Sequence, residues 1–277
     1  MLSPAVFIHG LYPGVFLWSN LMDKVSQNRI SYYIDLPGFA NSTKTVFSES
    51  GDVNESAIVN FIEEWRKNLQ LEDFSIIAHS FGCYFSFAYC LRFPQFVKKF
   101  ILIDPWGIYS LNMNKHELNN SDWSKLANPQ YFTSKFFSPL AIMRHTGKIM
   151  HVLSNAFRQD LIKNFKYLPK QTFYDYLEYS SSNDVATGER LFDSVQNNVY
   201  FASHPMIERA GKLDTNIELY CLISKNSFIR DFHKNFDIQM KQVLGERLKG
   251  FEILIDVDDK IITNPKFADH LSSKILC

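Results

Sequence analysis

The chain has 277 residues, of which 46% are hydrophobic and 25 are phenylalanine, a composition typical of a well-packed globular protein. Lysine plus arginine and aspartate plus glutamate number 29 each, so no net charge favours nucleic acid or an acidic partner. Apolar runs are far shorter than the ~20 residues of a membrane span. The four cysteines have no metal-binding spacing, and no metal or cofactor is expected. Since no signal peptide is evident either, the sequence predicts a cytoplasmic protein.

Short β-rich apolar runs alternate with helical segments along the chain, which predicts a mostly parallel sheet covered by helices. The clearest helices are expected at 56–69, where apolar residues recur with helical spacing, and at 82–92. The strands are expected at residues 5–8, 30–34, 74–78, 100–103, 219–223 and 251–255. The sequence therefore predicts an α/β fold with about six strands.

The alternation stops between residues 108 and 204, where clean strands are absent and apolar residues stand at helical spacing. An insertion of this kind after a strand predicts a helical cap over the carboxyl ends of the strands, where open α/β sheets place their sites. The core is then formed by residues 1–107 and 205–277. The alternative is a second helical domain with no role at the site.

Ser80 stands at the junction between a buried strand and a helix, in the run Ala78-His79-Ser80-Phe81-Gly82. A nucleophile on such a turn is strained, so the positions two before and two after it must be small, as Ala78 and Gly82 are. The helix amino terminus favours negative charge beside the serine. These features predict a nucleophile elbow, and a serine that merely caps an ordinary helix is the less favoured alternative.

The predicted elbow implies two backbone donors for an oxyanion. The Phe81 N–H follows the nucleophile directly, and the Leu11 N–H lies after the first strand, where an α/β hydrolase places its second donor. His9, in His9-Gly10-Leu11, is interpreted as a residue that structures the loop rather than as a base. The prediction is therefore an α/β-hydrolase fold with Ser80 at the nucleophile position.

Several motifs resemble those of the abhydrolase-domain lipid subfamily of α/β hydrolases. They are His9-Gly10 with Trp18, Asp35-Leu36-Pro37-Gly38-Phe39, Ala78–Gly82, Asp104-Pro105-Trp106-Gly107, Arg158-Gln159-Asp160, Thr187-Gly188-Glu189 and Pro205-Met206-Ile207-Glu208-Arg209. The resemblance covers nearly the whole chain. It implies phospholipid or acylglycerol ester chemistry, a lysophosphatidate acyltransferase activity in some relatives, and association with a lipid-droplet or membrane surface, with a lipase partner or with mitochondria.

The chain departs from this family at the other two triad positions. The loop after the last strand contains no histidine, and the family's base falls on Asp258, while the aspartate of its acyltransferase motif falls on Thr263. In the loop after the fifth strand, Arg230 stands where the family has its acid, with Asp231 one residue later as a possible acid. Because a carboxyl with a reference pKa near ~3.9 is a poor base for a serine, weak turnover is expected.

Other histidines are less favoured as replacements for the base. His204 and His233 are the more plausible candidates, because the end of the cap and the acid loop can approach the pocket. His79 is expected to point away from the elbow, and His270 belongs to the terminal helix. Asp104 is an alternative acid, although an acid without a base achieves little.

The sequence leaves three functions open. The first is a weakly active serine ester hydrolase or acyltransferase, and the second is a non-catalytic lipid-binding regulator or lipase co-activator. The third is a remnant without independent function, because the family fold has two strands before the one that ends in His-Gly and the chain begins directly at that strand. Without those strands, residues 30–34 are expected to form an exposed sheet edge unless a partner or lipid surface covers it.

Overall fold

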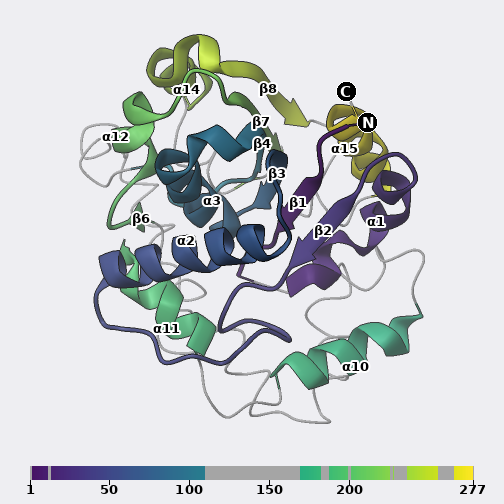
Figure 1. Cartoon of the computed structure of the whole chain (residues 1–277). Coiled ribbons are helices and arrows are strands. Elements are labelled where there is room, and N and C mark those ends of the chain that lie inside the picture. Colours follow the sequence, from purple (N-terminus) through teal and green to yellow (C-terminus); the bar gives the residue numbers. More distant parts are fainter. Residues whose placement is uncertain are drawn as a thin grey trace, which may run out of the picture.

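Six parallel strands form the central sheet of this computed structural model, in the order β2-β1-β3-β4-β7-β8 (Figure 1). The structure describes residues 2–11, 14–109, 169–181, 187–198, 201–224, 227, 236–254 and 265–276. The sheet strands are β1 (Ala5–Ile8), β2 (Ser31–Ile34), β3 (Phe74–His79), β4 (Val97–Ile103), β7 (Glu218–Ser224) and β8 (Leu248–Leu254). The predicted α/β architecture is confirmed, and each strand expected from the sequence overlaps an observed one.

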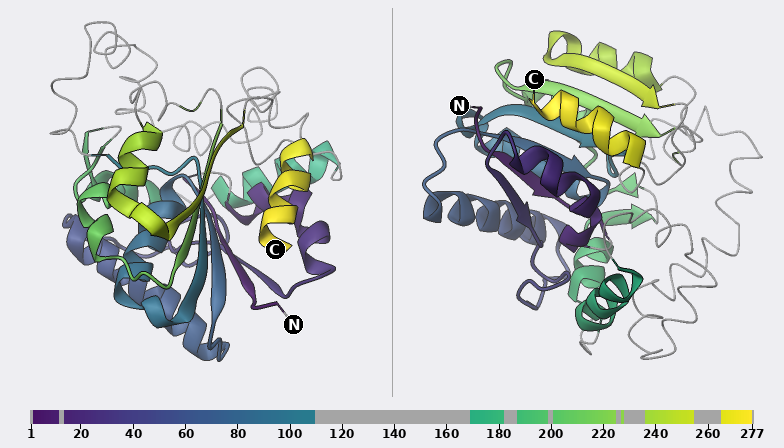
Figure 2. Two further views of the ribbon diagram at one scale, coloured as in Figure 1. Left: turned by 90° about the horizontal axis from the view of Figure 1, so that it is seen from above. Right: turned by 90° about the vertical axis from the view of Figure 1, so that its right-hand side faces the viewer.

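Helices cover both faces of this sheet, as the two views in Figure 2 show. The helices α1 (Ser19–Ser26) and α15 (Pro265–Leu276) lie on one face, where Trp18, Leu21 and Phe267 pack on Phe7 and other sheet residues. The opposite face carries α2 (Gly51–Asn68), α3 (Phe81–Arg92) and α14 (Phe236–Leu244), over a larger core. Burial on both faces explains why most residues of the central strands are apolar.

Four shorter elements lie between β4 and β7 in the chain. They are α10 (Lys170–Ser181), α11 (Thr187–Ser194), the two-stranded antiparallel hairpin of β5 (Gln196–Asn198) with β6 (Phe201–Ala202), and α12 (Met206–Arg209). The expectation that residues 108–204 contain no strand is wrong at this hairpin. Its first strand, Gln-Asn-Asn, is polar and three residues long, so it carries no apolar alternation that a pattern search detects.

The start of helix α2 differs from expectation for a physical reason. Helix α2 begins at Gly51 rather than at 56, because its first turn is set by polar contacts and not by apolar spacing. The Asn54 side chain accepts a hydrogen bond from the Ser48 N–H at 2.9 Å and donates to the Ser48 carbonyl at 2.7 Å. Asp52 in the first turn also complements the positive end of the helix dipole.

Strand β2 forms one edge of the sheet within the described residues, as the sequence predicts. Its register with β1 pairs Ala5 with Ser31 and Ile8 with Ile34. Across the described ranges, no helix combines the length and the apolar character that crossing a membrane requires.

Candidate active site

The Ser80 backbone occupies a strained conformation between β3 and α3, with φ 49° and ψ −118°. A positive φ is unfavourable for a residue with a Cβ, so surrounding contacts must hold it there. The Ser80 N–H donates to the Ile103 carbonyl at 2.9 Å, and the Ser80 carbonyl accepts from the N–H groups of Cys83 at 3.0 Å and Trp106 at 3.1 Å. The turn is therefore tied both to α3 and to the end of β4.

Small residues allow two backbone segments to meet closely at this turn. A Cβ added at Gly82 would lie 2.3 Å from the His9 carbonyl oxygen and 2.8 Å from that of Ile8. A Cβ added at Gly10 would lie 3.1 Å from the Ser80 Cβ and 2.9 Å from His79 Nδ1. The structure therefore explains why position 82 must be small, and it brings the His9-Gly10 loop directly beside Ser80.

The predicted oxyanion donors lie on the two segments that meet here. Phe81 is the first residue of α3, so its N–H belongs to the unpaired helix amino terminus, and Leu11 follows Gly10 in the adjoining loop. The role of both N–H groups as oxyanion donors stays a prediction.

His9 is buried completely, and both of its ring nitrogens have neighbours. Nε2 accepts a hydrogen bond from the Leu36 N–H at 3.0 Å, Nδ1 lies 2.5 Å from the Gly10 carbonyl oxygen, and Nε2 lies 3.7 Å from Asp35 Oδ1. Burial lowers the pKa of His9, although Asp35 opposes that effect. These contacts agree with the interpretation of His9 as a loop-structuring residue.

His79 is the described histidine next to Ser80 in the chain. Its Nδ1 is buried and has no hydrogen-bond partner in the described part of the chain. Burial, and in second place the neighbouring His9, lowers the pKa of His79 to about 3, so its ring is neutral and weakly basic at neutral pH. Among the described residues, no side chain forms a hydrogen bond with the Ser80 hydroxyl.

The remaining described histidines are engaged elsewhere. His204 Nε2 lies 2.7 Å from Asp52 Oδ1 on α2, and about half of its side chain (49%) is exposed. His270 Nε2 lies 2.6 Å from Glu252 Oε2. The suggestion that His204 serves as a base therefore receives no support from its contacts. Several residues considered from the sequence lie outside the described residues: Arg230, Asp231, His233, Asp258 and Thr263.

Asp104 joins the carboxyl ends of β4 and β7, and Ser80 follows the carboxyl end of the neighbouring strand β3. Its Oδ1 accepts a hydrogen bond from the Ser224 N–H at 2.8 Å, and its own N–H donates to the Leu222 carbonyl at 2.9 Å. The residue is buried and has a positive φ of 40°. Sequence patterns do not predict this strained backbone, because an aspartate in the left-handed region needs no distinctive neighbours.

Aromatic rings surround Phe81, the residue after the nucleophile. The centroids of Phe85, Phe192 and Trp106 lie 4.9, 5.0 and 5.4 Å from that of Phe81, and Phe39 lies 6.1 Å away. Sequence reasoning missed Phe192 of α11, because it is distant in the chain from the elbow. Within the described ranges no group of three or more histidine, cysteine or carboxylate side chains is arranged to hold a metal ion.

The sheet order and the strained serine turn define the α/β-hydrolase class of proteins. Residues 4–175 match the family model described as the alpha/beta hydrolase fold, and the chain belongs to that family. Among solved structures, the epoxide hydrolase VrEH1 of Vigna radiata superimposes with a TM-score of 0.69 over 99% of this chain and 90% of its own, at 14% identity. This similarity confirms the predicted fold.

Relatives in animals place the chain more narrowly, as the motif resemblance indicated. It is 31% identical to the abhydrolase domain-containing protein abhd-5.2 of Caenorhabditis elegans, over 82% of this chain and 49% of that protein. It is 28% identical to the human (lyso)-N-acylphosphatidylethanolamine lipase and to the human 1-acylglycerol-3-phosphate O-acyltransferase ABHD5, covering 82% of this chain and 66% and 64% of those proteins. The chain thus spans about half the length of abhd-5.2.

Proposed function

We propose that this protein acts on carboxylic esters of phospholipids or acylglycerols, with Ser80 at the nucleophile position and with slow turnover. The observation that carries the proposal is the elbow itself, a serine held at φ 49° beside Gly10 and Gly82. The similarity of the chain to a (lyso)-N-acylphosphatidylethanolamine lipase and to a 1-acylglycerol-3-phosphate O-acyltransferase supports a lipid substrate. Slow turnover follows from the sequence, since the loop of the expected base contains no histidine.

The proposed reaction begins with attack of the Ser80 oxygen on the ester carbonyl. The Phe81 and Leu11 N–H groups stabilise the negative charge that develops on the carbonyl oxygen, and the alcohol leaves with a proton. The resulting acyl-serine is cleaved by water in hydrolysis, or by the free hydroxyl of a lysophospholipid in acyl transfer. In this scheme the oxyanion donors remain and the proton acceptor is weak.

The weak proton acceptor limits the first step. At the family's histidine position this chain has Asp258, and its Arg230 occupies the acid position, with Asp231 as the nearest replacement. A carboxylate with a reference pKa near ~3.9 accepts a proton from serine far less readily than an imidazole near ~6.5. Residual catalysis is then expected from the oxyanion donors and from substrate binding.

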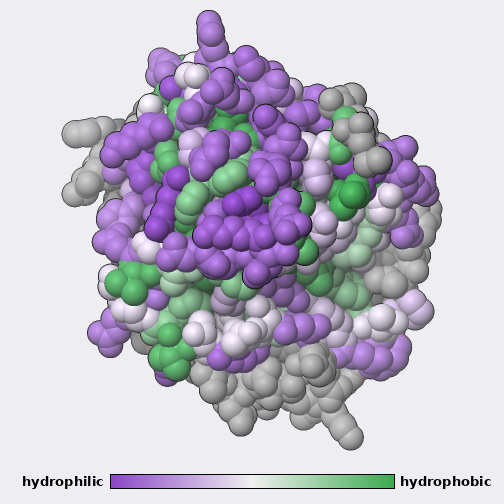
Figure 3. Space-filling model, in the orientation of Figure 1, coloured by the Kyte–Doolittle hydropathy of each residue, from purple (hydrophilic) through white to green (hydrophobic). Residues whose placement is uncertain are grey.

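The proposal includes a lipid-facing cap formed by residues 108–204 over the core of 1–107 and 205–277. The described residues of this segment support it, because Phe192 of α11 packs against Phe81 and Trp106 beside the nucleophile. The face of the molecule that carries α2 is largely hydrophilic, with hydrophobic side chains only in small separate patches (Figure 3). We therefore expect contact with a membrane or lipid-droplet surface on another face.

The direct test is labelling of the purified chain with a fluorophosphonate probe, which reacts with activated serines. We expect slow labelling that disappears in Ser80→Ala and persists in Ser86→Ala. Ser86 is a matched control because it lies on the same helix, where its hydroxyl donates to the Gly82 carbonyl at 2.8 Å. Release of fatty acid from phospholipid, lysophospholipid and acylglycerol substrates then identifies the preferred ester. Labelling that persists in Ser80→Ala would falsify the proposal.

A second candidate function is a non-catalytic lipid-binding regulator, for example a co-activator of a lipase at a lipid-droplet surface. The replacements at Arg230 and Asp258 favour it, because they remove the base without removing the elbow. It predicts that fatty-acyl ligands bind equally to the parent chain and to Ser80→Ala, with no ester hydrolysis by either. Hydrolysis that is lost in Ser80→Ala decides for the enzyme.

A further inference from the structure

Helix α11 is joined to the loop after β2 through one carbonyl group. The Gly38 carbonyl accepts a hydrogen bond from the Gly188 N–H at 3.1 Å and another from the Thr187 hydroxyl at 3.1 Å. Thr187 is buried, with 3% of its surface exposed, so the hydroxyl has little access to water that might replace Gly38. The two partners are 149 positions apart in the chain, so this contact fixes a long-range arrangement.

Two glycines allow the segments to approach this closely. Gly38 has a φ of 88°, and a Cβ there would lie 2.9 Å from the Gly188 nitrogen. A Cβ added at Gly188 would lie 2.5, 2.7 and 2.8 Å from three carbons of the Phe39 ring. Any side chain at position 188 must therefore push α11 outward or turn the Phe39 ring.

The rings held by this contact lead to the nucleophile turn. Phe39 packs against Phe81 with centroids 6.1 Å apart, and Phe192 of α11 packs against Phe81 and Trp106, each at 5.0 Å. The backbone N–H of Trp106 donates to the Ser80 carbonyl at 3.1 Å. The peptide between Ser80 and Phe81, which carries the Phe81 N–H, is thus flanked by rings whose positions depend on where α11 lies.

We infer that Gly188 and Phe192 are positioning residues for the Ser80–Phe81 peptide. When α11 is seated on Gly38, the rings of Phe39 and Phe192 hold the Phe81 side chain and with it the direction of the Phe81 N–H. A shift of α11 turns this peptide and so moves the Phe81 N–H at the amino terminus of α3. The electrostatic stabilisation of a negative charge at position 80 is then weaker, although Ser80 itself is unchanged. The inference rests on the proposed role of Ser80 as the nucleophile position, but its test requires no turnover.

The test uses a Ser80→Cys background and measures the rate of alkylation by iodoacetamide across pH. Its midpoint gives the thiol pKa, which a helix amino terminus lowers, and its plateau reports accessibility. Three native thiols, of Cys83, Cys90 and Cys221, are fully buried, and burial raises the pKa of each. Labelling of the chain that retains Ser80 is subtracted as the background.

We expect Gly188→Ala to raise the pKa of the introduced thiol and to slow its alkylation at neutral pH by about three- to tenfold, since one pKa unit is about tenfold in thiolate. Gly211→Ala is the matched control, because a Cβ added at Gly211 meets nothing within 4 Å. It should leave the profile unchanged. A purely structural role for Gly188 would lower the melting temperature without moving the midpoint.

Phe192→Leu keeps the inference testable if Gly188→Ala does not fold. It removes the ring that contacts Phe81 and Trp106 but retains an apolar side chain, and it should shift the midpoint in the same direction. Unchanged midpoints in folded Gly188→Ala and Phe192→Leu would overturn the inference. Absence of ester turnover in the parent chain would count only against the proposed function, because alkylation does not depend on it.

Discussion

The nucleophile turn fits the pattern of an α/β hydrolase more closely than do the two loops expected to carry its partners. At the turn, Ser80, Gly82 and Gly10 retain every feature that the strained backbone requires. In the partner loops, the sequence predicts that the family's acid and base positions fall on Arg230 and Asp258. On that prediction, the turn keeps the geometry of a nucleophile elbow, whereas the partner loops lack the histidine that would act as its base.

The difference follows from what each region does for the fold. Gly82 and Gly10 lie where backbone segments meet, so their substitution disturbs the core whether or not the protein is catalytic. The side chains predicted to act as acid and base stand on loops, and loops generally tolerate exchange at little cost in stability. The presence of an elbow therefore indicates the fold and its geometry, whereas activity depends on the residues of the partner loops.

Supplying a base and an acid at the predicted positions gives the largest expected effect and tests this comparison most directly. We expect the double substitution Asp258→His with Arg230→Asp to increase fluorophosphonate labelling of Ser80 by about 10²–10⁴-fold, the contribution typical of a general base. The measurement is the second-order labelling rate at neutral pH. The expected gain depends on Ser80 and disappears in the triple variant with Ser80→Ala.

The control for this restoration is Asp258→Asn, which removes the carboxylate but supplies no base and should leave labelling slow. If the double variant folds and labels no faster than the parent chain, the elbow has lost more than its base. The comparison between a preserved turn and changed loops would then need to be abandoned.

Sequence reasoning succeeded where a local pattern carries the information. Apolar runs predict the strands. The succession of a strand, a small-x-Ser-x-small run and a helix predicts the tight turn at Ser80. The interpretation of His9 as a loop-structuring residue agrees with the hydrogen bond that its ring accepts from the Leu36 N–H. Each of these features depends on neighbours close in the chain or on a strongly apolar segment.

Sequence reasoning failed where the determining contact is distant or polar. The start of α2 depends on the Asn54 side chain, and the β5–β6 hairpin begins with a polar strand. The contact of Gly188 with Gly38 spans most of the chain, and nothing local to either glycine marks it. The sequence marks the motif at 187–189 only through its resemblance to a family. Its contact with the Gly38 carbonyl is seen only when α11 and the loop after β2 are brought together in the fold.

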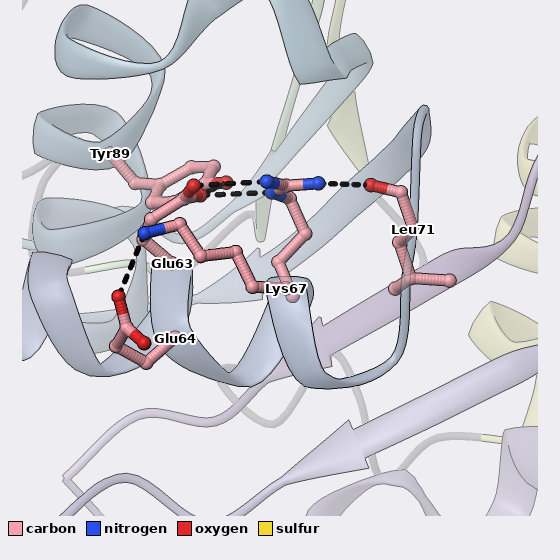
Figure 4. Close-up of polar contacts among 6 residues, drawn as sticks. Glu63, Glu64, Lys67, Leu71 and Tyr89 are labelled. Carbon is pink, nitrogen blue, oxygen red and sulfur yellow. Dashed lines mark hydrogen bonds and ion pairs between the residues drawn. The ribbon is translucent and has the colours of Figure 1, made fainter.

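The elbow helix α3 is also supported far from Ser80, by a buried network with α2. Arg66 donates to Glu63 through Nε at 2.9 Å and Nη2 at 3.0 Å, and the Tyr89 hydroxyl donates to Glu63 Oε2 at 2.8 Å (Figure 4). Both charged side chains are nearly buried. We expect Arg66→Met to lower the free energy of unfolding by about 3–5 kcal/mol in urea denaturation, because Glu63 is left charged and unpaired.

A neighbouring pair provides the control for this substitution. Lys67 and Glu64 form an ion pair at 2.8 Å with the same spacing on the same helix, but both side chains are more than half exposed. Lys67→Met should therefore cost less than about 1 kcal/mol. Equal losses in the two variants would show that burial of the Glu63–Arg66 pair contributes nothing, and that α3 is held by apolar packing alone.

Gly82→Ala tests whether sterics alone preserve the turn. The added methyl group meets two backbone carbonyl oxygens, which cannot move as a flexible side chain would, so we expect a loss of about 3 kcal/mol in urea denaturation. Gly211→Ala, with open space around its Cβ, should change stability by less than about 0.5 kcal/mol. A stable Gly82→Ala would mean that the turn is preserved for catalysis after all.

The pH dependence of stability gives the smallest and most specific effect. The hydrogen bonds from Arg66, followed by that from Tyr89, lower the pKa of Glu63, although burial opposes them. The unfolded chain therefore binds a proton at Glu63 at a higher pH than the folded chain does. The stabilisation is complete above the ordinary glutamate pKa of about 4.3 and is lost as the pH falls through the folded pKa.

Glu63→Gln isolates this contribution, since glutamine keeps the shape of the side chain but does not titrate. As the pH falls below the ordinary glutamate pKa, the unfolding free energy of the parent chain should fall more steeply than that of Glu63→Gln. The total extra loss should be about 1.4 kcal/mol for each pKa unit between the unfolded and folded values. Urea denaturation in steps between pH 5 and pH 3 (about half a unit each) measures both slopes. Parallel slopes would show that the Glu63–Arg66 pair is not coupled to folding, and the support of the elbow helix would then rest on its aromatic core.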